Sequence, residues 1–144
     1  MTANATGSTR PPRRLLRSTV AVISGLIAVV APSVGTDLLM SQIGVFPPSD
    51  QPMHSAGQFL IALGYRSAYA VFGSWIAATL SPRTPMRHAL ILGVIGLALN
   101  LAGLAVEIMT PDLGPMWYPT ALVLTALPCA WLGGALSSTV RAVA

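Results

Sequence analysis

The chain has 144 residues, of which 53% are hydrophobic and only 8% are charged, and its mean hydropathy is +0.70. A soluble domain carries about 25% charged residues because its surface faces water. This composition excludes an ordinary soluble enzyme and predicts a membrane protein. The net charge is +4, but all eight basic residues are arginines that are scattered along the chain. That scatter argues against a phosphate-binding patch, and we therefore expect no nucleic-acid partner.

Residues 1–14 are small, polar and proline-bearing, with no hydrophobic periodicity. Such a segment has too little apolar surface to offset the entropy cost of ordering, so we expect a disordered tail. Residues 15–144 are then expected to form a single transmembrane domain. The first apolar stretch also resembles a secretory signal, with small residues at Ser33 and Gly35 near a possible cleavage site. Cleavage there would leave three helices, and this alternative stays open.

Four apolar segments follow the tail, at residues 18–39, 57–80, 87–109 and 116–136. Each is close to the ~20 residues that an α-helix needs to cross a hydrocarbon core of ~30 Å. Each of the three links between them contains at least two prolines, which end helices. The pattern predicts an all-α membrane protein, an antiparallel bundle of four transmembrane helices.

The charged residues are sorted between the two ends of these segments. Seven arginines precede the first segment, lie between the second and third, or follow the fourth, whereas all four acidic residues lie at or beyond the opposite ends. The positive-inside rule makes the arginine-rich end cytoplasmic, which predicts that both termini are inside. Arg66 is the one arginine that lies inside an apolar segment rather than at its end.

Small residues recur at alternating spacings of three and four along each apolar segment. Such faces let helix backbones approach closely in a bilayer, where water does not drive association. These small-residue faces favour a compact bundle with small residues inside. One of the faces could instead pack against a second copy of the chain in a homo-oligomer. The third segment illustrates the spacing with Ala89, Gly93, Gly96, Asn100, Gly103 and Glu107.

Arg66 is the most informative single residue, since an arginine within the bilayer costs at least ~2.5 kcal/mol and needs a partner. Asn100 lies at a matching depth on the third segment, and Glu107 shares its face two turns further out. Asp37, at the outer end of the first segment, is a second carboxylate within reach. One hypothesis is a polar transport site in which Arg66 binds an anionic group; the other is a structural ion pair of Arg66 with Glu107 or Asp37.

No catalytic, metal or cofactor site is expected. His54 and His88 fall at opposite ends of the helices, so they cannot bind one haem or zinc ion together. The single cysteine, Cys129, has no second thiol or positioned base, which favours a packing role. Hydrolase motifs such as HExxH and GxSxG are absent from the sequence.

Two stretches, residues 81–93 (SPRTPMRHALILG) and 115–134 (PMWYPTALVLTALPCAWLGG), together with Trp75-Ile-Ala-Ala, carry a family resemblance. They resemble small four-helix inner-membrane proteins of bacteria, a family without an assigned activity. The resemblance covers the second to fourth segments and implies a bacterial inner (plasma) membrane, but it transfers no active residue.

The sequence thus favours a non-enzymatic accessory or assembly subunit that packs against the helices of a membrane-protein partner. Short links, small-residue faces and the lack of a soluble domain support this hypothesis. The alternative is a small oligomeric transporter or channel with a polar site around Arg66, Asn100 and Glu107. Under both hypotheses we expect the protein to be embedded in the lipid bilayer.

Overall fold

The computed structural model describes residues 12–48, 51–53, 55–81, 84–110 and 114–143. The predicted all-helical class is confirmed, since four helices account for most of these residues. They are α1 (Pro12–Gln42), α2 (Ala56–Leu80), α3 (Pro85–Met109) and α4 (Trp117–Val143). Residues 1–11 of the predicted tail lie outside the described residues.

The helices extend beyond the apolar segments from which they were predicted. α1 begins at Pro12, so residues 12–14, assigned above to the tail, belong to the helix. Proline is favoured at the first helical position because its missing N–H would be unpaired there in any case, and α3 begins in the same way at Pro85. α4 continues to Val143 rather than ending near residue 136. Hydropathy marks the apolar part of a helix, whereas backbone hydrogen bonding continues into its polar flanks.

Within the described part of the chain, three helices are long and apolar enough to cross a membrane: α1, α3 and α4. α2 is as long as α3, with 25 residues each. It is outside this set because its middle carries Tyr65, Arg66, Ser67 and Tyr69. Three of these residues, Tyr65, Arg66 and Tyr69, make polar contacts with α1.

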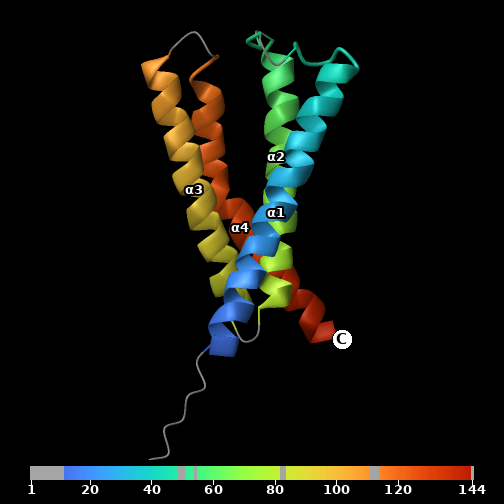
Figure 1. The fold of residues 1–144 in the computed structure, drawn as a ribbon, viewed down its shortest axis with the longest axis vertical. Helices are drawn as coiled ribbons and strands as arrows, with labels where there is room; N and C mark the ends of the chain where they lie inside the picture. Colours follow the sequence, from blue (N-terminus) through green and yellow to red (C-terminus); the bar gives the residue numbers. More distant parts are fainter. Residues whose placement is uncertain (1–11, 49–50, 54, 82–83, 111–113, 144) are drawn as a thin grey trace, which may run out of the picture.

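The four helices cross at one end and diverge towards the other (Figure 1). The crossing lies near the end where α1 begins and α4 finishes, which we call the termini end. At the opposite end, which holds the link between α1 and α2 and which we call the link end, the α1–α2 pair separates from the α3–α4 pair. α2 contacts the other three helices, whereas α1 makes no close backbone approach to α4 among the described residues.

Glycines explain where the backbones meet. A Cβ atom on Gly93 of α3 would lie 2.5 Å from the Cβ of Ala130 of α4, and one on Gly134 would lie 3.0 Å from the Cβ of Ala89. Further along α3, a Cβ on Gly96 or Gly103 would meet nothing within 4 Å. The small-residue face of α3 is therefore packed near the crossing and open towards the link end.

The link after α1 folds back over α2. Gly44 adopts a positive φ of 75°, which reverses the chain direction. The Gln58 side chain of α2 then donates a hydrogen bond of 2.7 Å to the carbonyl of Val45, and Phe46 is buried beside the ring of Tyr65. This cap covers the link end of the α1–α2 pair.

Candidate functional site

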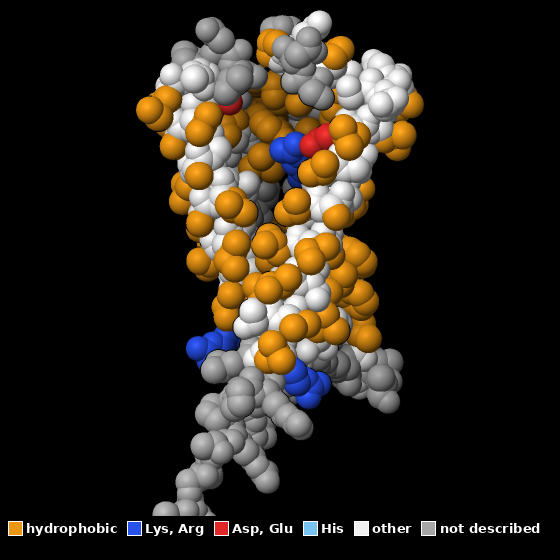
Figure 2. All heavy atoms as spheres, in the orientation of Figure 1, with side chains coloured by type: hydrophobic (Ala, Val, Ile, Leu, Met, Phe, Trp, Pro, Cys, Tyr) orange, Lys and Arg blue, Asp and Glu red, His pale blue; other side chains and the backbone are white. Residues whose placement is uncertain are grey.

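A cavity of about 300 Å³ lies between the diverging helices, and we call it the cleft. Residues of all four helices line it, and most of its wall is apolar. In Figure 2 the molecule is hollowed between α3 and the link-end half of α1, with basic and acidic side chains visible within the hollow. Residues that line the cleft include Val34, Asp37, Arg66, Gly96, Asn100 and Cys129.

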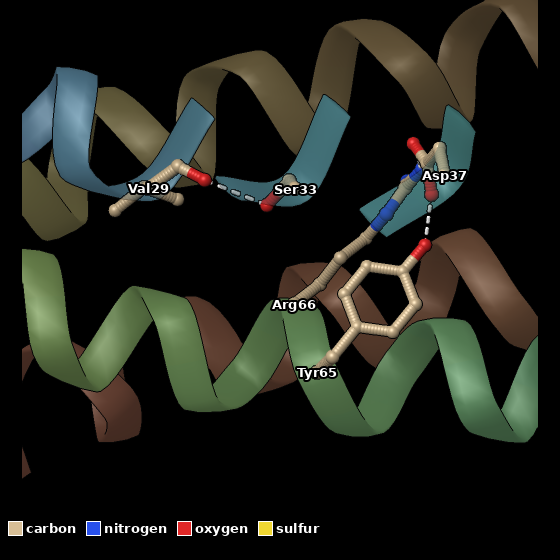
Figure 3. Close-up of polar contacts among 5 residues, drawn as sticks. All are labelled: Val29, Ser33, Asp37, Tyr65 and Arg66. Carbon is tan, nitrogen blue, oxygen red and sulfur yellow. Dashed lines mark hydrogen bonds and ion pairs between the residues drawn. The ribbon is translucent and has the colours of Figure 1, made fainter. Parts of the chain in front are cut away.

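An ion pair between α1 and α2 forms the polar part of the cleft (Figure 3). The Arg66 guanidinium donates from Nη2 to Oδ2 of Asp37 at 2.8 Å, and the Tyr65 hydroxyl donates to Oδ1 of the same carboxylate. Both charged side chains are 35% exposed, so the pair is half-buried. Both carboxylate oxygens of Asp37 are thus engaged by α2.

Neighbouring residues place these groups against one another. Tyr69 lies one helical turn from Tyr65 on α2, and its hydroxyl is 2.9 Å from the hydroxyl of Thr36 on α1. Residues four apart share a helix face, so the two tyrosines present a polar edge to the end of α1. The adjacent Thr36 and Asp37 meet this edge, which fixes the carboxylate opposite Arg66.

The ion pair also lines a second, smaller cavity of about 210 Å³ under the α1–α2 link, which we call the link pocket. Its other lining residues include Ser41, Phe46 and Pro47. Asp37 and Arg66 are therefore shared by both cavities. The salt bridge stands between the cleft and the pocket at the link end.

The other two candidate residues have separate positions. Asn100 lines the cleft, and its side-chain amide donates a 3.0 Å hydrogen bond to the carbonyl of Leu122 on α4. Glu107 is not among the residues that line the cleft, and its buried Oε1 has no hydrogen-bond partner. Of the two ion pairs considered from the sequence, the structure forms Arg66–Asp37 and not Arg66–Glu107. Glu107 lies near the link end of α3, where the α3–α4 pair has separated from the α1–α2 pair, whereas Asp37 is on the helix that packs beside Arg66.

Tyr118, at the start of α4, is a polar residue that the sequence analysis did not assign to the site. It lies within electrostatic range of Arg66 and Asp37, and its buried hydroxyl has no hydrogen-bond partner. Nε of Arg66 is likewise buried and unpartnered. The Tyr118 ring packs on Phe59 of α2, with ring centroids 5.0 Å apart. Tyrosines near a helix end are common at membrane interfaces, so nothing in the sequence distinguished this one.

The two remaining candidate residues that the structure describes, Cys129 and His88, do not contact the ion pair. Cys129 is buried and lines the cleft near the crossing. His88 is also buried, and its Nδ1 lies 2.9 Å from both the Ser81 hydroxyl and the Thr84 carbonyl at the turn between α2 and α3. His54 lies outside the described residues. Among the described residues, no three His, Cys, Asp or Glu side chains gather where they could hold a metal ion.

Comparisons of the chain with protein-family models, with curated proteins and with solved structures gave no match.

Proposed function

We propose that the protein is a small membrane carrier that takes a membrane-dissolved amphipathic molecule into the cleft and releases it through the link pocket. The observation that carries this proposal is that Asp37 and Arg66 line both cavities. An ion pair in that position acts as a gate, because its separation would join the two spaces. The cleft volume of about 300 Å³ is at the lower end of the range of small-molecule sites, which are mostly apolar with a few polar groups.

The setting that we propose is a bacterial inner membrane, crossed by all four helices, with both termini in the cytoplasm. The apolar character of α1, α3 and α4 and the arginines near the termini end support this setting. α2 would cross as the fourth helix, since its half-buried arginine is paired with α1. The link pocket would then face away from the cytoplasm, and the open side of the cleft would face lipid.

A cavity-filling substitution tests whether the cleft binds a ligand. Gly96 lines the cleft and a Cβ there meets nothing within 4 Å, so Gly96→Leu should fold normally and fill the space. We expect decanol, a neutral single-chain probe, to bind the wild-type protein in phosphatidylcholine nanodiscs and to be lost from Gly96→Leu. Native mass spectrometry counts the bound adducts directly.

The matched control is Gly35→Leu on α1, where a Cβ also meets nothing within 4 Å but the residue does not line the cleft. This variant should bind decanol like the wild type. Equal binding by both variants and the wild type would show that the probe sits in the surrounding lipid, and the carrier proposal would then fail.

The second candidate is the accessory or assembly subunit, which a feature of α1 favours. Large side chains at spacings of three and four form an exposed seam along this helix, the spacing found where helices pack as coiled coils. The seam consists of Val20, Ile23, Ile27, Val30, Val34 and Leu38, each about half exposed.

Extraction from native membranes tests this candidate. A partner that packs on the seam should co-purify in stoichiometric amount and be lost from the double variant Ile23→Ala, Ile27→Ala. Leu124→Ala, an exposed site on α4, should retain it. A protein that remains bound to all variants, or that none of them retains, counts against a subunit that packs through α1.

A further inference from the structure

Arg66, at the polar end of the cleft, has more hydrogen-bond donors than the structure pairs. Both oxygens of Asp37 are already engaged, one by Tyr65 and one by Nη2 of Arg66. The guanidinium has five N–H donors in a planar fork, and its buried Nε has no partner. Arg66 therefore keeps donor capacity beyond its ion pair with Asp37.

Buried polar groups without partners are rare, and each one calls for an explanation such as an absent ligand. An acceptor-rich headgroup in the cleft would satisfy the remaining donors of Arg66. Carboxylates and phosphates are the groups that the guanidinium fork binds best, because two parallel N–H···O bonds match their geometry. The apolar wall on the side of Val34 and Leu99 would then contact the chain of the same molecule.

Resting on the proposed function, we propose that the carried molecule is an oxyanion with a single apolar chain, bound through its carboxylate or phosphate by Arg66. Asp37 serves as the internal substitute for the ligand. It neutralises Arg66 when the cleft is empty. The molecule enters the apolar cleft as its neutral acid and passes its proton to Asp37, which then gives up the guanidinium to the new oxyanion. No charge is left unpaired in the membrane, where one would cost several kcal/mol.

The two anions compete for one guanidinium, and this competition gives the proposal a specific signature. Asp37→Asn removes the competing charge but keeps an oxygen that can accept from Tyr65. We expect this variant to bind decanoate or decyl phosphate at least about tenfold more tightly than the wild type, a change of about 1.4 kcal/mol. Decanol, which carries no charge, should bind both proteins equally. Titration in phosphatidylcholine nanodiscs with native mass spectrometry measures all three probes.

The double variant Asp37→Asn, Arg66→Gln isolates the contribution of the arginine. It leaves no unpaired charge, so it should fold as well as the wild type. We expect it to lose the preference for decanoate and decyl phosphate over decanol.

The outcomes separate this inference from the proposed function. Decanol binding that is lost in Gly96→Leu, together with oxyanion binding that is unaffected by Arg66, would retain the cleft as a binding site and overturn the oxyanion assignment. Tighter decanoate binding in Asp37→Asn supports a carboxylate ligand, and tighter binding of decyl phosphate alone supports a phosphate ligand. Unchanged oxyanion affinity in Asp37→Asn overturns the proposal.

Discussion

Gly25 of α1 and Gly73 of α2 face each other where the first two helices cross. A Cβ atom on Gly25 would lie 2.7 Å from the carbonyl oxygen of Gly73, and one on Gly73 would lie 2.5 Å from the carbonyl oxygen of Gly25. The approach is reciprocal, and both obstacles are backbone atoms that a side-chain rotation cannot move. The two helices can therefore cross this closely only because neither Gly25 nor Gly73 carries a Cβ atom.

This contact gives a prediction about the sign of a stability change. Glycine to alanine in a helix ordinarily stabilises by ~0.8–1.0 kcal/mol. At Gly25 or Gly73 the added methyl must push the helices apart, so we expect a net loss of about 1–3 kcal/mol. Thermal unfolding in detergent, followed by circular dichroism, measures the change. Gly35→Ala on the open face of α1 is the control and should raise the unfolding temperature.

The ion pair predicts which second substitution rescues the loss of Arg66. Arg66→Ala leaves Asp37 as an unpaired carboxylate in the membrane, at a cost of about 2.5–3.5 kcal/mol, so the abundance of the folded protein should fall. Adding Asp37→Asn should restore abundance, because no charge is then left unpaired. Glu107→Gln should not restore it, since Glu107 does not contact Arg66. Rescue by Glu107→Gln in membrane fractions would contradict the observed pairing.

Cys129 provides a native probe of the gate, because it is the single cysteine and lines the cleft. We expect a membrane-permeant maleimide to label it in vesicles, and a charged thiosulfonate added from the water to label it poorly. Removal of the gate in Asp37→Ala, Arg66→Ala should let the charged reagent reach the thiol. Mass spectrometry of the labelled chain measures both rates, with Cys129→Ser as the blank. An unchanged rate for the charged reagent would mean that the salt bridge does not separate the two cavities.

Asn100 predicts a smaller effect. Its single hydrogen bond to the carbonyl of Leu122 joins α3 to α4, and such interhelical bonds in membranes contribute about 0.6 kcal/mol on average and up to ~1.7. Asn100→Leu should therefore lower the unfolding temperature slightly and keep the fold. A complete loss of folded protein would indicate that Asn100 does more than join these two helices.

The sequence predicted the number, order and approximate extent of the helices because each depends on local properties, namely apolar length and the prolines between segments. It also indicated that Arg66 needs a partner, since this follows from the cost of one charge in a bilayer. The choice between Asp37 and Glu107 depends on which helices stay together at the link end. That arrangement is set by packing over the whole chain, such as the approach of Gly25 to Gly73, and depth arguments cannot supply it.

Tyr65 and Tyr118 were missed for a related reason. Tyr65 is next to Arg66 in the sequence, so it points roughly 100° away around an ideal helix. Both side chains nevertheless reach Asp37, because the carboxylate sits between their directions. The four-residue spacing of Tyr65 and Tyr69 was the one available indication of a polar edge on α2. Tyr118 comes from a different helix, and only the three-dimensional structure brings it near the ion pair.

The divergence of the two helix pairs has a practical consequence for handling the protein. In the proposed membrane setting, the hydrocarbon of the surrounding lipid would complete the interior where α1 and α3 separate, because an apolar cavity of this size is not filled by water. Acyl chains would then form part of the packed core on this side of the molecule. Solubilisation exchanges them for detergent tails, so detergent chain length becomes a determinant of conformation, and different detergents should stabilise different separations of the two pairs.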